Sequence, residues 1–179
     1  MAESLQRLGA KVTLVLGPVG SLSLDKNIKL IRFKFFNELK NAITRELKSK
    51  KYDIVIHSAA VSDYRPAKSY DKKIKSGMKY WNLKLVPTVK IIDLIRKIGC
   101  SLFLVGFKFE TGLEKKALLK EAKRQMLRLN LDLVVANSID KDTYLAYILE
   151  PGKIYGPKLN KKYLVQELVN ITREKIWKG

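Results

Sequence analysis

Two lysines and one carboxylate follow an apolar stretch closely enough to act on one ligand. Residues 53–57 read as a buried strand, the small residues 58–60 come directly after it, and Asp63, Lys73 and Lys75 follow in the next loop. In an open α/β sheet, ligands bind beyond the carboxyl ends of the strands. Small residues there let a ligand approach the backbone, and lysines there can hold phosphate. The stretch therefore predicts a site for a nucleotide or a phosphorylated substrate.

Asp63 and the two lysines suit particular parts of such a ligand. Asp63 could accept hydrogen bonds from a sugar hydroxyl or hold a metal-bound water, or it could cap the loop or pair with Arg65. Lys73 and Lys75 flank one residue, so an extended backbone directs both to the same side. Two ammonium groups suit a triphosphate, and one could stabilise an oxyanion at an acyl centre. A solvated surface cluster is the ordinary alternative.

Other side chains at the ends of predicted strands have two explanations each. Phe107 could stack on a base or close the core, and Asn137 could bond a ligand or cap a turn. Thr88 could cap the helix predicted to end at residue 98, and Glu110 with Thr111 reads as a loop carboxylate followed by a helix cap. These positions stay candidates for the same site.

The single histidine and the single cysteine do not indicate metal or thiol chemistry. His57 ends its strand without histidine, cysteine or dense carboxylate partners nearby in the sequence, so no zinc site is predicted. Cys100 lies between a helix and a strand without a His–Asp pair, and we predict a structural role for it.

Residues 64–68 match the Y-x-x-x-K pattern of NAD(P)-dependent short-chain reductases. That catalytic pair needs both side chains on one helical turn, and Pro66 would remove an amide donor and crowd the preceding turn. The chain also has no G-x-G-x-x-G loop for the cofactor. Such a reductase is therefore a lesser alternative.

Composition limits the class of protein. The chain has 179 residues, with 36 basic and 17 acidic side chains and a formal charge of +19. The lysines are scattered, and a basic nucleic-acid-binding module would rest on this charge alone, without a recognition motif. No apolar run approaches the about 20 residues of a membrane span, and the start does not resemble a signal peptide. With one cysteine, we expect a cytoplasmic protein.

Strand and helix patterns alternate, which predicts one α/β domain over residues 1–179, Rossmann-like, with a mostly parallel sheet and helices on both faces. The chain opens inside a helix, at residues 1–8, so the usual first strand and glycine-rich turn are not matched. The remaining predicted elements are strands at 11–16, 28–33, 53–57, 80–86, 101–107 and 131–137, helices at 36–49, 88–98, 112–129 and 160–177, and a small hairpin at 144–149 and 153–155.

Six motifs follow one another along the chain. They are G-A-x-V-T-L-V-x-G-P-V at 9–19, A-A-V-x-D-Y-R-P at 59–66, K-I-K at 73–75, L-K-L at 83–85, V-G-F-x-x-E-T at 105–111 and N-L-D-L-V-V-A-N at 130–137. In this order they resemble the motifs of phosphopantothenate–cysteine ligase, the CoaB activity of coenzyme A biosynthesis. The resemblance runs from about residue 3 to residue 175.

The resemblance implies a two-step reaction. A nucleoside triphosphate, CTP or ATP, activates the carboxylate of 4'-phosphopantothenate with magnesium, and the cysteine amine then attacks the acyl-nucleotide. By motif, nucleotide contacts are implied for His57, Ser58, Ala59, Ala60, Asp63, Lys73, Lys75 and Phe107. Lys73 would also be the catalytic lysine that turns the acyl intermediate into product. The resemblance further implies a homodimer whose central loop crosses to the partner, and it allows a decarboxylase on another chain.

Departures from the family pattern affect three places. The family's K-N-P-D-I stretch is replaced at 87–91, which leaves Lys90 and Ile91 as the nucleotide-contact candidates. Two family lysines fall at Gln125 and Leu129, and our hypothesis is that the neighbouring Arg124 and Arg128 supply the phosphate charge. The family's opening, with its substrate-binding asparagine, is not matched. We therefore expect a truncated or alternatively started ligase domain with weak or no activity by itself.

Overall fold

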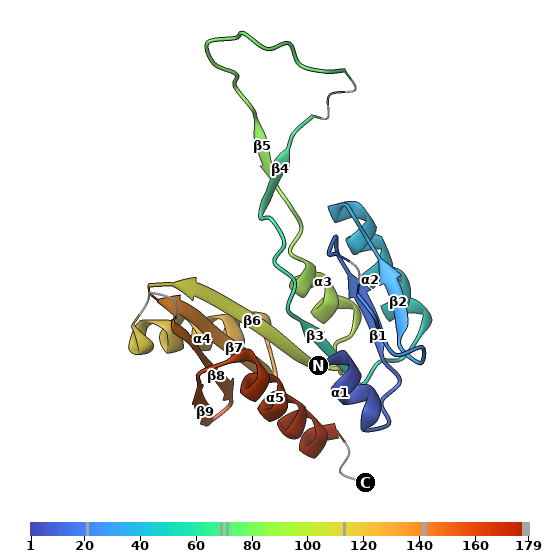
Figure 1. The fold of residues 1–179 in the computed structure, drawn as a ribbon, viewed down its shortest axis with the longest axis vertical. Coiled ribbons are helices and arrows are strands. Elements are labelled where there is room, and N and C mark those ends of the chain that lie inside the picture. Colours follow the sequence, from blue (N-terminus) through green and yellow to red (C-terminus); the bar gives the residue numbers. More distant parts are fainter. Residues whose placement is uncertain (21, 69, 71, 113, 141–142, 177–179) are drawn as a thin grey trace.

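A computed structural model shows an α/β body from which one long arm extends (Figure 1). None of the helices in the described part of the chain is long and apolar enough to cross a bilayer. The structure describes residues 1–20, 22–68, 70, 72–112, 114–140 and 143–176, so the predicted helix end at 177 lies outside it.

The first part of the chain forms a small parallel pair of strands and their helix. After α1 (Ala2–Arg7), β1 (Thr13–Leu16) pairs in parallel with β2 (Lys29–Arg32), and α2 (Phe36–Ser49) follows. The helix has the predicted bounds because its apolar residues recur at helical spacing, and Leu39 and Ala42 are buried on its inner face.

The second part forms a five-stranded sheet in the order β3-β6-β7-β8-β9. β3 pairs in parallel with β6, and β6 with β7, whereas β7, β8 and β9 are antiparallel. The parallel central strands and the terminal hairpin were both predicted. The strand bounds are Ile54–His57 for β3, Phe103–Thr111 for β6, Leu133–Asp140 for β7, Thr143–Glu150 for β8 and Lys153–Lys158 for β9.

Helices cover both faces of this sheet, as predicted. Along β6, Leu104 points into a core shared with α2, α3 (Ile91–Ile98) and α4 (Lys115–Leu129). The next residue, Val105, points into a second core on the opposite face, under α5 (Lys161–Ile176). Both are fully buried, as strand alternation between two helical layers requires.

The strand predicted at 80–86 is mostly wrong. Only β5 (Leu85–Pro87) is a strand, and it pairs antiparallel with β4 (Tyr64–Pro66), which was not predicted. The loose alternation of apolar residues before β5 lies on the arm, where Tyr80 and Trp81 are exposed and have no sheet to cover. Alternation therefore misled the prediction, because it reports a half-buried strand only where a core exists.

Two predicted helix caps are also wrong. Thr88 does not cap α3, whose N-cap is Lys90; its hydroxyl donates to the carbonyl of Ser62 at the base of the arm, at 2.6 Å. Glu110 and Thr111 belong to β6, which continues because β7 runs beside it. The end of a strand is set by its neighbour, and the local sequence does not carry that information.

Candidate functional site

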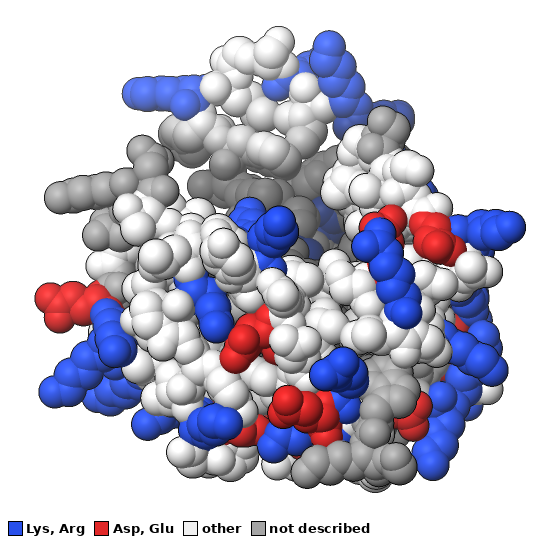
Figure 2. All heavy atoms as spheres, turned by 60° about the horizontal axis from the view of Figure 1, so that its bottom comes forward, with Lys and Arg blue, Asp and Glu red and all other residues white. Residues whose placement is uncertain are grey.

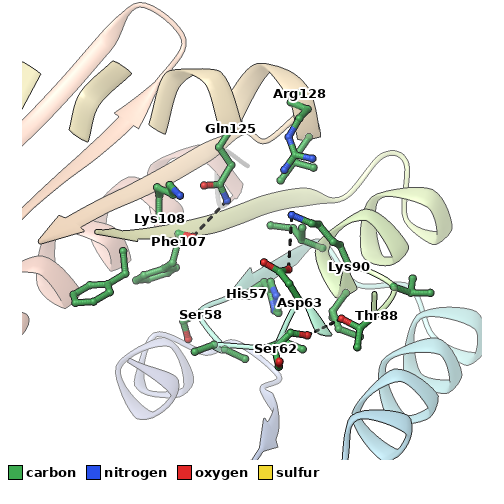
Figure 3. A pocket seen from close by; sticks show the side chains of 18 of the residues that line it. His57, Ser58, Ser62, Asp63, Thr88, Lys90, Phe107, Lys108, Gln125 and Arg128 are labelled. Carbon is green, nitrogen blue, oxygen red and sulfur yellow. Dashed lines mark hydrogen bonds and ion pairs between the residues drawn. The ribbon is translucent and has the colours of Figure 1, made fainter. Parts of the chain in front are cut away.

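A cleft of about 680 Å³ lies beyond the carboxyl end of β3 and beside the second half of β6 (Figure 3). This is the edge at which ligands bind in parallel α/β sheets. Four segments line it: residues 57–63 after β3, residues 88–92 leading into α3, residues 107–109 on β6, and residues 121, 124, 125, 128 and 129 on α4.

The floor of the cleft is made of the small residues that the sequence singled out. β3 ends at His57, and Ser58, Ala59 and Ala60 follow with exposed surfaces. Burial lowers the pKa of His57 below its ordinary 6.5, so the ring is neutral at neutral pH. The floor therefore offers backbone groups and a neutral imidazole to a ligand and carries no charge of its own.

Asp63 and Lys90 face each other across the cleft mouth (Figure 3). The Lys90 ammonium lies 3.8 Å from the Asp63 carboxylate, and 46% and 67% of these side chains are exposed. Such a loose, solvated pair is worth little to stability, so both groups are free to bind a ligand instead. Arg65, the alternative partner considered for Asp63, donates to the carbonyl of Pro66.

One wall of the cleft is formed by β6. Phe107 and Lys108 both line it, and Lys108 pairs with Glu110 two residues further along the strand. The side-chain amide of Gln125 donates to the Phe107 carbonyl at 3.4 Å, which links this wall to α4 (Figure 3). Lys108 was not predicted, because the strand was expected to end at Phe107.

One face of α4, which packs beside β6, forms a further part of the lining. Four side chains at helical spacing lie on this face: Glu121, Arg124, Gln125 and Arg128. Glu121 was not predicted, although its spacing from Arg124 was a signal that could have identified it. Arg124 pairs with Glu121 at 2.7 Å, whereas Arg128 forms no ion pair with any residue the structure describes. Both arginines line the cleft, and phosphate binding by them stays a hypothesis.

The two lysines of the predicted site lie elsewhere. Lys73 and Lys75 are exposed on the arm between β4 and β5, which extends away from the body (Figure 1). Neither lines the cleft. The structure therefore brings together His57, residues 58–60, Asp63, Lys90, Ile91 and Phe107, but it does not bring Lys73 or Lys75 to them within one chain.

The remaining candidates do not join the cleft. Asn137 lies within β7, and its buried side-chain oxygen has no partner among the described residues. Tyr64 and Pro66 lie in β4, so the helical turn that a Y-x-x-x-K pair requires is absent from residues 64–66. Among the described residues, no group of three or more His, Cys, Asp or Glu side chains could hold a metal ion.

The surface charge does not gather into a stripe on the face drawn in Figure 2. Lysines and arginines are scattered there, with aspartates and glutamates between them. A basic groove or ridge that follows a nucleic-acid backbone would look different. On this face the high positive charge reads as solvated side chains.

Comparison with known sequences gives one consistent group. A family model described as the DNA/pantothenate metabolism flavoprotein C-terminal domain matches residues 1–170. The coenzyme A biosynthesis bifunctional protein CoaBC of Thermococcus kodakarensis is 44% identical over 139 residues, which are 78% of this chain and 34% of the relative. The chain thus spans about a third of the length of that relative.

Solved structures share the fold. The DNA/pantothenate metabolism flavoprotein from Streptococcus pneumoniae has a TM-score of 0.83 at 23% identity, over 97% of this chain and 85% of that one. A Cab2 mutant in complex with phosphopantothenate-cysteine has a TM-score of 0.63 at 20% identity, over 84% of this chain and 54% of that one. At these identities the likeness establishes the fold.

Proposed function

The chain belongs to the family of DNA/pantothenate metabolism flavoprotein C-terminal domains, and we propose that it joins 4'-phosphopantothenate to cysteine at the expense of a nucleoside triphosphate. The single observation that carries this proposal is the cleft. It combines an uncharged floor of small residues with a rim of Lys90, Lys108, Arg124 and Arg128. A base and sugar suit such a floor, and three phosphates suit such a rim.

Two relatives support the choice of substrates. The Thermococcus kodakarensis relative is named a coenzyme A biosynthesis protein, and the Cab2 structure holds phosphopantothenate-cysteine. The product of the proposed reaction is a carboxylated cysteine amide, which a decarboxylase can consume. We propose that such a partner acts next, on another chain or on a further segment.

The proposed chemistry has two balanced steps. The substrate carboxylate attacks the α-phosphorus, a bond to the bridging oxygen breaks, and pyrophosphate leaves. The cysteine amine then attacks the acyl carbon, the nucleoside monophosphate leaves, and the amine loses a proton. The role of the rim cations is to hold the phosphates and to offset the charge that develops on the leaving oxygens.

Magnesium fits this cleft as a companion of the triphosphate. Mg²⁺ is usually held by one or two carboxylates together with substrate phosphates. Asp63 and Glu121 are the carboxylates that line the cleft among the described residues. Either could hold a metal-bound water, and the metal would supply further positive charge at the phosphates.

The proposed catalytic lysine does not reach the cleft of its own chain in this structure. Lys73 lies on the arm, outside the cleft of its own chain. The arm also carries exposed Tyr70 and Trp81, whose rings pack edge to face at 5.5 Å. Aromatic side chains of this kind are typical of interfaces. We therefore propose a homodimer in which each arm brings Lys73 to the cleft of its partner.

Nucleotide binding and turnover test the proposal directly. Calorimetry with CTP, ATP, GTP and UTP should show binding of at least one triphosphate, and we expect CTP. With 4'-phosphopantothenate, pyrophosphate release should follow. In the Lys73→Gln variant, acyl-nucleotide should accumulate without amide, whereas the neighbouring Lys72→Gln should behave as the parent. Absence of binding by all four nucleotides would refute the proposal. Full turnover by these 179 residues would contradict only the expectation of weak activity.

A further inference from the structure

The second step of the proposed reaction releases a proton inside the cleft. The cysteine amine becomes positively charged as it bonds to the acyl carbon, and it must lose one proton before the amide is complete. A side chain that accepts this proton has to be basic near neutral pH and has to lie beside the ligand. The floor itself, at residues 58–60, consists of one serine and two alanines and has no such group.

His57 lies where such a group is needed. It ends β3 directly before the floor, and it lines the cleft (Figure 3). Neither nitrogen of its ring forms a hydrogen bond with a residue that the structure describes. The ring nitrogens also differ from the fully buried polar atoms without a partner in the described part of the chain, which are Arg96 Nε, Asn137 Oδ1 and Ser138 Oγ. The ring is therefore open to a ligand in the cleft.

The protonation state of the ring suits a proton acceptor. Burial lowers the pKa of His57 below its ordinary 6.5, so the imidazole is neutral at pH 7. A neutral imidazole carries a proton on one nitrogen and a lone pair on the other. The lone pair can take a proton from a cationic amine, and the ring can afterwards release that proton to water.

The other ionisable groups of the cleft are already committed. The Asp63 carboxylate faces Lys90 at 3.8 Å, and the Glu121 carboxylate pairs with Arg124 at 2.7 Å. These two carboxylates are also the candidates for holding the magnesium that accompanies the triphosphate. The remaining ionisable groups of the lining are cations, which have no lone pair to offer: Lys108 and Arg128. His57 is thus the uncharged base among the described residues of the lining.

The groups on the other side of the ring do not compete for this role. His57 also lines a second cleft along β1 and α2, whose titratable groups are the terminal amine of Met1, Lys11, Glu46 and Tyr52. The Glu46 carboxylate accepts hydrogen bonds from Lys29 at 2.7 Å and from Tyr52 at 2.8 Å. Tyr52 precedes His57 by five residues, which span roughly 16 Å in an extended chain. The carboxylate on this side therefore lies at the opposite end of β3.

We propose that His57 is the general base of the second step and that its imidazole accepts the proton that the cysteine amine loses. The amine lone pair forms the C–N bond, and the carbonyl electrons move to oxygen. The proton passes to the ring while its bonding electrons stay on nitrogen. The adduct then collapses, and the nucleoside monophosphate leaves with the electrons of the broken C–O bond. Lys73 and His57 thus act on different atoms, the lysine on oxygen and the imidazole on nitrogen. This inference rests on the proposed function.

The second step can be measured without the first. Chemically prepared 4'-phosphopantothenoyl cytidylate is mixed with cysteine and an excess of the 179-residue chain, and the amide is quantified by mass spectrometry. We expect the chain to accelerate amide formation relative to the reaction in buffer. His57→Gln should slow it by about a hundredfold, because general bases contribute about 10²–10⁴-fold. Binding of the cytidylate in the absence of cysteine should stay nearly the same, since the backbone of the floor is unchanged.

Two further measurements separate a base from a residue needed only for packing. The ratio of the parent rate to the His57→Gln rate cancels the protonation of the cysteine amine itself. This ratio should fall as the pH drops from 7 to 5, because a protonated ring accepts no proton. In His57→Ala, added imidazole should restore part of the rate in proportion to its concentration. Tyr52→Phe, which changes the opposite end of β3, should keep the rate and the pH profile of the parent.

Each contrary result has one meaning. Equal rates in the parent and His57→Gln, or a ratio that is independent of pH together with no rescue by imidazole, would refute the role of His57 and leave the ligase proposal intact. If the parent does not accelerate amide formation from the cytidylate, the inference is also wrong. The nucleotide-binding experiment then decides the proposed function independently.

Discussion

At the scale of single residues, His57 links stability to pH. Burial lowers its pKa below 6.5 in the folded chain, so at pH below about 6.5 the unfolded chain binds a proton that the folded chain does not. The free energy of unfolding should therefore fall as the pH drops from 7 to 5. In His57→Gln this part of the decline should vanish. Because His57 is the only histidine, denaturant titrations of both proteins at pH 5, 6 and 7 measure its contribution to the free energy of unfolding. An equal decline of this free energy in the parent and the variant would contradict the prediction.

The arginines of α4 test the phosphate end of the cleft. We predict that replacing both Arg124 and Arg128 by Gln weakens CTP binding by about tenfold or more, since each charged hydrogen bond is worth about 1.5–3 kcal/mol before solvent screening. Binding of the uncharged nucleoside should not change. Arg7→Gln, an exposed substitution on α1, serves as the matched control. Calorimetry measures the CTP affinity of each protein. Equal affinity in the parent and the double variant would refute the hypothesis that these arginines bind phosphate.

Residue types could be predicted wherever the pattern is local. The floor at 58–60 follows its strand directly, and Asp63 follows within the same loop, so both were found in the sequence. Lys108 was missed because its position depends on how far β7 extends beside β6. Lys73 was selected by motif, but its distance from the floor depends on the direction of the arm, which no local pattern encodes.

At the scale of elements, the base of the arm is held by few bonds. The Thr88 hydroxyl donates to the Ser62 carbonyl at 2.6 Å, and the Thr88 amide donates to the Asp63 carbonyl at 2.9 Å. We predict that Thr88→Val loosens this base while costing about 1 kcal/mol or less overall, because the bond is solvent-exposed. Hydrogen exchange at the amides of Thr88 and Ala67 should accelerate.

A matched substitution within a helix separates local from general loosening. Thr44 donates to the Lys40 carbonyl inside α2 at 2.8 Å, so Thr44→Val removes a similar bond far from the arm in sequence. It should leave exchange at Thr88 and Ala67 unchanged. If both variants accelerate these amides equally, the arm is not held by the Thr88 bond.

Elements with their own periodicity were predictable, and those that depend on partners were not. α2 was predicted with its observed bounds because its apolar residues recur at helical spacing. β4 could not be predicted, since Arg65 and Pro66 on a short exposed strand have no buried face. β3 was predicted as a buried strand and β1 as a strand; the structure has both strands, but each is half-buried.

At the scale of the whole molecule, the arm stands out because it extends far from the body (Figure 1). Among its described residues, strand pairing covers three residues on each side, and beyond β4 and β5 the aromatic side chains Tyr70, Tyr80 and Trp81 are exposed. An exposed arm of this kind gains burial by crossing to another copy, and two-fold symmetry then makes the exchange mutual. The dimer and the position of Lys73 are thus a single prediction.

A crosslinking experiment tests both parts of that prediction without requiring turnover. In a Cys100→Ser background, Lys73→Cys is labelled with a benzophenone maleimide and irradiated. We expect covalent dimers, and we expect mass spectrometry to place the crosslinks in the peptide that contains residues 57–63. The same label at Lys48→Cys, on the exposed end of α2, should not reach that peptide. A chain with residues 68–83 replaced by a short glycine turn should sediment as a monomer and still fold, since no described residue of the arm belongs to either core. Crosslinks found only within single chains would show instead that the arm folds back onto its own cleft, and Lys73 would then act on the floor of the chain that carries it.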